Sequence, residues 1–430
     1  MIKISMITLG CVKNTVDSEA IMALFKEPYF KITTDLNDTD AIIINTCGFI
    51  ESAKVEAINT ILDCLKYNKK LIVIGCLVER FYKELVKEIP EVDLWIKFKD
   101  EYTQLPQMIS KLFNNEVELP EFSIFNRVVS TDKTTCYLKI SEGCNRFCGF
   151  CAIPYIRGRF VSYDEDELVE YAKNAAKDGA KELVLIGQDP TSYGMGLKDK
   201  NINLVHLLRR LNEIEGFVFI RCLYMYPHGI TKELVDFIRD NKKMVHYFDI
   251  PIQHISNNVL KEMHRVDTKE STIEKLNYIK EQIPDAVFRT TLIVGYPNET
   301  EEDFKELLSF VNDFKFNHLG VFTFSCEEGT YASHLKNIVS EEEAMKRKEA
   351  IMKNQATISY RLNQRLIGKE MDAVIIKKDR KQYIIRTSYD APDDIDGKVI
   401  LMSQKEHNPG DVVKVKVTNA LVYDLLCEEI

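Results

Sequence analysis

Residues 140–158 read ISEGCNRFCGFCAIPYIRG and place Cys144, Cys148 and Cys151 in a CxxxCxxC pattern. Thiolates spaced this closely can wrap one [4Fe-4S] cluster, and three ligands for four irons leave one iron without a protein ligand. An iron with an open position can bind a substrate or a cofactor. The alternative is a structural zinc site, which needs four closed ligands. No further Cys or His stands within a few residues of the motif, so the pattern favours the cluster.

The motif follows the first of six strand-like runs that alternate with helical stretches. This alternation predicts a parallel sheet. Six units are two short of an eightfold barrel, so we expect an open, partial (β/α)6 barrel over residues 134–335. Its chemistry should lie where strands end and loops begin. The runs are CYLKIS (136–141), ELVLIGQD (182–189), FVFIRCLYMYP (217–227), HYFDIPIQ (246–253), VFRTTLIVGYP (287–297) and HLGVFTFS (318–325).

Three short β-branched runs precede the barrel, at residues 2–9, 41–45 and 71–75, and a stretch with helical spacing follows each of them. They predict a small open α/β domain with a parallel sheet over residues 1–115. Periodicity is weak over residues 116–133, which we interpret as a linker.

The chain beyond the barrel changes character twice. Residues 336–368 form a charged segment that predicts one connecting helix, with Gly368 as its stop signal. Residues 369–430 alternate with period two and are broken by Asp-Gly and Pro-Gly turns. This pattern predicts a small antiparallel β-barrel at the end of the chain.

A second group of cysteines is dispersed in the sequence. Cys11, Cys47 and Cys76 each directly follow one of the three N-terminal strand-like runs, in TLGC, INTC and VIGC. Because loops after parallel strands emerge at one carboxyl edge of a sheet, the three thiols can converge there. The alternative is that they are small buried residues, as free Cys often is. The other cysteines show no convergent spacing and are interpreted as structural: Cys64, Cys136, Cys222, Cys326 and Cys427.

Composition limits the functional classes. The formal net charge of −9 and the isoelectric point near 5.6 argue against broad binding to nucleic-acid phosphates. No apolar run reaches the roughly 18 residues of a membrane span, and the start lacks the features of a signal peptide. We therefore expect a cytoplasmic protein without a membrane partner. Eleven cysteines in a reducing compartment favour cluster ligation over disulfides.

The motif at residues 140–158 resembles the signature of the radical S-adenosylmethionine enzymes. This resemblance implies that the open iron chelates S-adenosylmethionine and that an electron from the reduced cluster cleaves it to a 5′-deoxyadenosyl radical. Gln188, at the end of the second barrel strand, is a candidate contact of S-adenosylmethionine. The pair Gln188 and Asp189 could equally cap the following turn.

Three N-terminal segments, LGCVKNTVDSE, NTCGFIESA and GCLVERF, resemble the cysteine segments of the methylthiotransferase N-terminal domain. The terminal β-barrel then resembles a TRAM domain. The resemblance implies that Cys11, Cys47 and Cys76 hold a second [4Fe-4S] cluster, also with one open iron, which supplies or carries sulfur. The expected cofactors are thus two [4Fe-4S] clusters and S-adenosylmethionine, and the expected overall reaction replaces C–H by C–S–CH3.

Further segments resemble the RimO family, which modifies the β-carbon of an aspartate in ribosomal protein uS12. They are YMYPHGIT, YFDIPIQHISNNVLKEMHR and FSCEEGTYA. CAIPYIRGR instead resembles the enzymes that modify adenosine in tRNA, so a tRNA adenosine 2-methylthiotransferase remains an alternative. A non-catalytic iron–sulfur binding or redox protein is an alternative of another class. An electron donor such as a flavodoxin or ferredoxin is an expected partner.

The charge of the chain favours a protein substrate over tRNA. A tRNA-binding module should be basic, whereas residues 369–430 carry 10 basic and 12 acidic residues, a net charge of −2. An acidic surface complements a basic ribosomal protein. The four aspartates of SYDAPDDIDG (388–397) could contribute to docking, or they could form an ordinary solvated turn.

Several other polar residues stand at strand ends or turns. Gly295 should make a tight turn, and Thr300 and Asp303 have the spacing of a capping box. Related enzymes more often show a glycine where Asn298 stands. Four further residues could face a cofactor or substrate, or could belong to satisfied core networks: Arg221, Gln253, His254 and Arg289.

Overall fold

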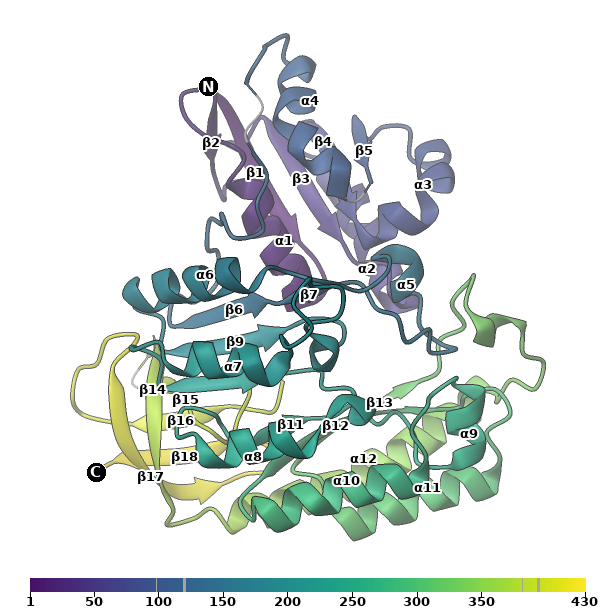
Figure 1. The fold of residues 1–430 in the computed structure, drawn as a ribbon. Helices are drawn as coiled ribbons and strands as arrows, with labels where there is room; N and C mark the ends of the chain where they lie inside the picture. Colours follow the sequence, from purple (N-terminus) through teal and green to yellow (C-terminus); the bar gives the residue numbers. More distant parts are fainter. Residues whose placement is uncertain (98, 119–120, 381, 393–394) are drawn as a thin grey trace. The chain divides into compact units, whose positions relative to one another are not determined.

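The computed structural model describes residues 1–430 except residues 98, 119–120, 381 and 393–394 (Figure 1). The chain divides into two compact units. Unit 1 contains Met1–Thr131, Gly143–Asn145 and Cys151–Arg159, and unit 2 contains Asp132–Glu142, Arg146–Phe150 and Phe160–Ile430. No helix in the described part of the chain is long and apolar enough to cross a membrane. The predicted domain boundaries stay predictions.

Unit 1 is built on a five-stranded parallel sheet in the order β2-β1-β3-β4-β5. It confirms the predicted α/β class and adds two short edge strands, β2 and β5. The strands are β1 (Ile2–Thr8), β2 (Phe30–Ile32), β3 (Ala41–Thr46), β4 (Lys70–Gly75) and β5 (Leu94–Ile96). The helices are α1 (Val12–Met22), α2 (Glu51–Leu65), α3 (Cys76–Glu88), α4 (Leu105–Leu112), α5 (Ile153–Ile156) and a 3₁₀ helix at Lys99–Gln104.

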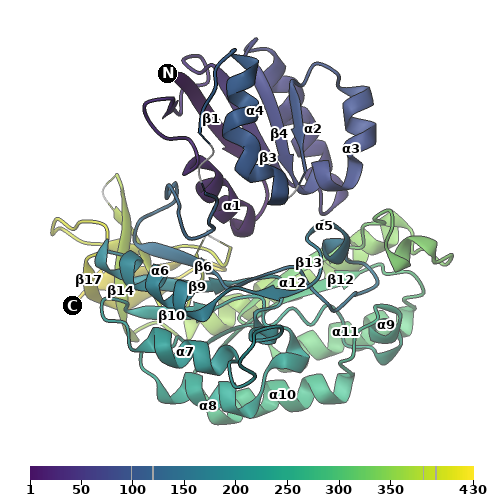
Figure 2. The same ribbon diagram turned by 45° about the horizontal axis from the view of Figure 1, so that its top comes forward.

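Both faces of this sheet are buried, which explains why its central strand is apolar throughout. On one face, Ile43 packs with Ile21 of α1 and Ile109 of α4. On the other face, Ile42 and Ile44 belong to a second apolar cluster with residues of α2 and α3. Figure 2 shows α1 and α4 together in front of the sheet. Helices on both faces leave the carboxyl ends of the strands as the open edge of unit 1.

Unit 2 contains the six predicted barrel strands, in two parallel sheets of three, β6-β9-β10 and β11-β12-β13. A single parallel bridge between Ile220 and Met244 lies where the two sheets adjoin. The partial barrel is thereby confirmed. The strands are β6 (Thr135–Lys139), β9 (Glu182–Ile186), β10 (Phe219–Cys222), β11 (Tyr247–Asp249), β12 (Val287–Val294) and β13 (His318–Thr323).

Helices alternate with these strands along the chain (Figure 1). They are α6 (Glu165–Lys177), α7 (Leu204–Asn212), α8 (Lys232–Asp240), α9 (Asn257–Glu262), α10 (Lys269–Gln282) and α11 (Glu301–Phe314). Short 3₁₀ helices span Pro190–Ser192, Pro227–Gly229 and Tyr331–His334, and the short strands β7 (Ser141–Glu142) and β8 (Val161–Ser162) pair antiparallel.

The turn between β12 and α11 agrees with its sequence pattern. Gly295 has φ +74, and a Cβ atom there would lie 2.5 Å from the Cβ of Ala344. Thr300 and Asp303 form the predicted capping box, in which each side chain accepts the other residue's amide. Asn298 has φ +67, the left-handed conformation that glycine adopts most easily. Asparagine is one of the few residues other than glycine that adopt this conformation readily.

The end of the chain forms helix α12 (Glu341–Gln364) and a closed barrel in the order β14-β15-β16-β18-β17. The barrel confirms the prediction with one correction: β16 and β18 pair in parallel, so the barrel is mixed rather than antiparallel. Its strands are β14 (Glu370–Asp379), β15 (Gln382–Arg386), β16 (Val399–Met402), β17 (Val412–Ala420) and β18 (Leu425–Glu429).

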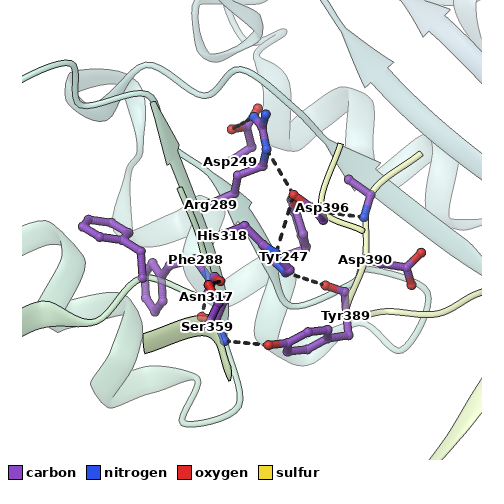
Figure 3. Close-up of polar contacts among 12 residues, drawn as sticks. Tyr247, Asp249, Phe288, Arg289, Asn317, His318, Ser359, Tyr389, Asp390 and Asp396 are labelled. Atoms are coloured by element: carbon purple, nitrogen blue, oxygen red, sulfur yellow. Dashed lines mark hydrogen bonds and ion pairs between the residues drawn. The ribbon is translucent and has the colours of Figure 1, made fainter. Parts of the chain in front are cut away.

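A loop of this terminal barrel inserts buried acidic side chains at the amino ends of the β11–β13 strands (Figure 3). Asp396 accepts the Tyr247 hydroxyl at 2.5 Å and lies 3.3 Å from the Arg289 guanidinium and 3.7 Å from His318. Arg289 also binds Asp249 at 2.9 Å. Arg289 therefore belongs to a core network, at the end of the strands opposite to the expected chemistry.

A second buried network joins β9 and β10 to the same barrel. The Arg221 guanidinium donates to Glu182 at 3.0 Å and to the Thr387 carbonyl at 3.1 Å. Arg386 lies 3.5 Å from Glu182 and pairs with Asp390. The core-network interpretation of Arg221 is thus correct.

The proposed docking role of SYDAPDDIDG is wrong for two of its four aspartates. Asp390 and Asp396 are 3% and 5% exposed, and they face internal partners instead of solvent. Asp393 and Asp394 lie outside the described residues.

Candidate functional site

The three dispersed cysteines lie at the open edge of the sheet in unit 1. Cys11 follows β1, Cys47 follows β3 and Cys76 follows β4, and these three strands are neighbours in the sheet. Gly10 shows how close two of the loops come, since a Cβ atom on it would lie 2.7 Å from the Cβ of Cys47 and 3.1 Å from its Sγ. The loops that carry Cys11 and Cys47 therefore lie side by side, as the topology predicts.

Helix N-termini and nearby charges affect the pKa values of these three thiols. Cys11 is the N-cap of α1, and Cys76 is the first residue of α3. The positive end of a helix dipole favours a thiolate. Burial raises the pKa of Cys76, against the charge and hydrogen bond of Arg157. Burial, together with Cys76 and Cys11 as charged neighbours, raises the pKa of Cys47 to about 11. For Cys11, burial raises the pKa, but Lys13, the Asn14 amide and Arg157 together lower it below its usual value.

Asn14 ties the three cysteine loops together. Its Nδ2 donates to the carbonyls of Leu9 at 2.9 Å and Thr46 at 3.2 Å, just before Cys11 and Cys47 in the chain. Its Oδ1 lies 3.8 Å from the Sγ of Cys76, which donates to it. The sequence pattern does not single out Asn14, because only the folded sheet shows that one amide reaches all three loops.

Gly10→Ala is expected to disturb this site. Gly10 has φ +88, so alanine there costs about 1–3 kcal/mol of strain, and its Cβ would displace Cys47. We expect reconstituted protein to lose iron by elemental analysis while retaining its fold by circular dichroism. The control is Gly368→Ala, which has φ +86 with no atom within 4 Å of the added Cβ. Equal iron in both variants would contradict the convergence of these loops.

The CxxxCxxC loop contributes residues to both units. Gly143–Asn145 and Cys151–Arg159 belong to unit 1, and Arg146–Phe150 belongs to unit 2. In unit 2, the amide of Gly149 donates to the Met263 carbonyl, and the amide of Ala332 donates to the Gly149 carbonyl, both at 2.8 Å. A Cβ on Gly149 would lie 2.8 Å from the Tyr296 hydroxyl oxygen. Backbone contacts therefore hold the segment around Cys148 in place.

Two arginines surround Cys148 with positive charge. Arg146 pairs with Asp189 at 2.7 Å, and the guanidinium groups of Arg146 and Arg265 stack on the Tyr226 ring at 4.3 and 4.4 Å. Burial raises the pKa of Cys148, and the charges of Arg265 and Arg146 act against burial. A thiolate ligand at this position is thus compensated by cations.

Gln188 and Asp189 have different surroundings. Asp189 accepts the hydroxyls of Thr191 and Ser192 and the Arg146 guanidinium, but its side chain accepts no backbone amide of the following 3₁₀ turn, so the expected side-chain cap is not formed. Gln188 donates from Nε2 to Glu142 at 2.7 Å. Its Oε1 is buried and has no hydrogen-bond partner among the described residues. An unpartnered amide oxygen at a strand end is consistent with a ligand contact, and that role stays a prediction.

The donor chemistry of both cysteine groups fits iron–sulfur clusters, which are held by Cys thiolates. Within the described residues, no three Cys, His, Asp or Glu side chains are arranged to hold a single metal ion. Of the remaining cysteines, four are buried and Cys326 is exposed.

Comparisons with protein families match the three parts of the chain. Residues 138–311 match the Radical SAM superfamily, residues 3–97 match Uncharacterized protein family UPF0004, and residues 367–430 match the TRAM domain. The first two matches contain the CxxxCxxC motif and the three converging cysteines, respectively.

Solved structures share this fold at low identity. The cobalamin-dependent S-adenosylmethionine radical enzyme OxsB matches with a TM-score of 0.53 and 14% identity, covering 83% of this chain and 58% of OxsB. The radical S-adenosylmethionine methyltransferase TsrM from Kitasatospora setae matches with a TM-score of 0.53 and 11% identity, covering 75% and 73%. Fold and motif together define a radical S-adenosylmethionine enzyme, a class that implies S-adenosylmethionine and a [4Fe-4S] cluster.

Full-length relatives identify the family. Proteins named ribosomal protein uS12 methylthiotransferase RimO are 43% identical in Caldicellulosiruptor saccharolyticus, over 100% of both chains, and 43% identical in Clostridium perfringens, over 99% and 97%. The Aquifex aeolicus protein of that name is 42% identical over 98% and 96%. The chain belongs to the RimO family of radical S-adenosylmethionine methylthiotransferases.

Proposed function

We propose that this enzyme replaces a C–H bond by C–S–CH3 at the β-carbon of an aspartate in ribosomal protein uS12. Full-length similarity to RimO proteins supports the substrate and the reaction class. The observation that supports the sulfur chemistry is the position of Cys11, Cys47 and Cys76 directly after the neighbouring strands β1, β3 and β4.

In this proposal, two cysteine sets hold two clusters. Cys144, Cys148 and Cys151 hold the cluster that binds S-adenosylmethionine, and Cys11, Cys47 and Cys76 hold the auxiliary cluster. When bound, these groups supply a 5′-deoxyadenosyl radical, sulfur and a methyl group. The arginines beside Cys148 compensate ligand charge, and Asn14 keeps the auxiliary ligands in register. Gln188 is the proposed protein contact of S-adenosylmethionine.

The cellular setting follows from the chemistry. Thiolate ligands persist in a reducing compartment, and a ribosomal substrate is found in the cytoplasm, so we infer a cytoplasmic enzyme. A low-potential protein such as a flavodoxin or ferredoxin would deliver the electron. The net charge of −9 supports a basic protein as substrate over tRNA.

The test is mass spectrometry of both candidate substrates. Anaerobically reconstituted enzyme receives S-adenosylmethionine and reductant with either uS12 or unmodified tRNA. We expect uS12 to gain the mass of one sulfur atom and one CH2 group, on a peptide that contains the target aspartate. The same gain on tRNA adenosine, with none on uS12, would overturn the proposal. Iron and sulfide without any 5′-deoxyadenosine would instead indicate a non-catalytic protein.

A further inference from the structure

Arg157 links the CxxxCxxC segment to the converging cysteines. It follows helix α5 and stands six residues after Cys151, and its side chain is 2% exposed. Arg157, Cys151 and all three converging cysteines belong to unit 1. A small apolar cluster of Cys76, Ala152 and Ile156 packs α5 against the start of α3.

The guanidinium contacts Asp17, Asn14 and Cys76. Its Nη1 binds the Asp17 carboxylate at 2.5 Å, and its Nη2 donates to the Asn14 Oδ1 at 2.5 Å. The same Nη2 lies 3.3 Å from the Sγ of Cys76 and donates to it. Asp17 and Asn14 are themselves buried, so the cation is fixed in one orientation by partners that cannot turn to solvent.

This arrangement exceeds what anchoring α5 requires. The ion pair with Asp17 already neutralises the buried charge of Arg157. The additional donor aimed at Cys76 places an N–H group on one of the ligand sulfurs. Hydrogen bonds to cluster sulfurs and local charge set the reduction potentials of iron–sulfur clusters. A donor of this kind stabilises the reduced form, which carries one more negative charge.

We propose that Arg157 is a positioning residue that raises the reduction potential of the auxiliary cluster through its hydrogen bond to the Cys76 Sγ. The inference rests on the proposed function, because it requires a cluster on Cys11, Cys47 and Cys76. It assigns to the PYIRG segment a role at the auxiliary cluster, although that segment directly follows the ligands of the other cluster.

The test isolates the auxiliary cluster in a Cys148→Ala background, since Cys148 belongs to unit 2 and its loss leaves the residues of unit 1 unchanged. In that background, Arg157→Met is combined with Asp17→Asn, so that a cation and its paired anion are removed together. Asp17→Asn by itself is the control, because it keeps the guanidinium beside Cys76. Iron content, thermal midpoint and redox-poised electron paramagnetic resonance spectra are recorded for each.

We expect the double variant to retain its iron and to show an about tenfold lower ratio of reduced to oxidised cluster at a fixed applied potential, as for the loss of one charge-assisted hydrogen bond. Asp17→Asn alone should not lower the ratio. An unchanged ratio in the iron-loaded double variant would overturn the inference, as would a loss of iron from a folded double variant. Absence of iron in the Cys148→Ala background itself would instead overturn the proposed function.

If the double variant fails to fold, Arg157→Lys replaces it. Lysine keeps the charge balance with Asp17 but lacks the planar fork that reaches Asp17, Asn14 and Cys76 together. The ratio should again fall, and an unchanged ratio in folded, iron-loaded Arg157→Lys protein contradicts the role of the hydrogen bond.

Discussion

Cys148→Ala is expected to abolish both 5′-deoxyadenosine formation and modification of uS12. Two remaining thiolates cannot hold the cluster that would bind S-adenosylmethionine, whereas the other set of three is untouched, so roughly half of the iron should remain. The expected result is a complete loss of both products by liquid chromatography and mass spectrometry.

A reciprocal variant sharpens this result. Cys76→Ala should lose the other half of the iron and methylthiolation, yet still form 5′-deoxyadenosine. The matched control is Cys64→Ala, a buried cysteine of α2 in the same unit, which should keep all the iron and both activities. Retention of 5′-deoxyadenosine by Cys148→Ala would refute the assignment of the CxxxCxxC motif.

Glu182→Gln is expected to destabilise unit 2 by about 3–5 kcal/mol, the usual cost of removing one member of a buried ion pair. Glu182 is fully buried and lies within 3.5 Å of both Arg221 and Arg386, so its neutralisation leaves buried guanidinium charge uncompensated. Denaturant titration of the loaded enzyme measures the free energy of unfolding.

Two further variants separate this effect from a general loss of charge. Glu342→Gln breaks the exposed Glu342–Lys346 pair on α12 and should cost about 0.5 kcal/mol or less. Adding Arg221→Met to Glu182→Gln removes the opposite charge and should recover part of the lost stability. If Glu182→Gln is as mild as Glu342→Gln, the network does not contribute to stability.

The main architecture was predictable because it rests on local patterns. Six barrel strands, the strands before Cys11, Cys47 and Cys76, and the cap at Thr300 all follow from periodicity or from residue pairs close in sequence. The edge strands β2 and β5 were missed, since three residues are too few to show a period. The parallel pairing of β16 and β18 was missed because register between distant strands leaves no local signal.

Some residues of the candidate site could likewise be predicted from the sequence, and others could not. The cysteines were predicted because their residue type and their positions after strand-like runs can be read from the linear sequence. Asn14 and Arg157 were missed because their importance lies in contacts between segments 143 residues apart. Asp396 of the 388–397 loop was misjudged for the same reason, since its partner Arg289 lies on β12, far earlier in the chain. Asp390 was misjudged although its partner Arg386 stands only four residues earlier.

The buried aspartates of the loop at residues 388–397 determine what loss of the terminal barrel would do to the rest of the chain. Asp396 contacts Arg289 and His318 and accepts the Tyr247 hydroxyl, and the Thr387 carbonyl accepts from Arg221, which also pairs with Glu182. A gene that lost the codons of residues 367–430 would remove Asp396 and Thr387, so that Tyr247 and His318 would lose a buried partner, while Arg289 would keep Asp249 and Arg221 would keep Glu182. A replacement for the TRAM domain would therefore have to supply a buried acceptor for the Tyr247 hydroxyl and a partner for His318.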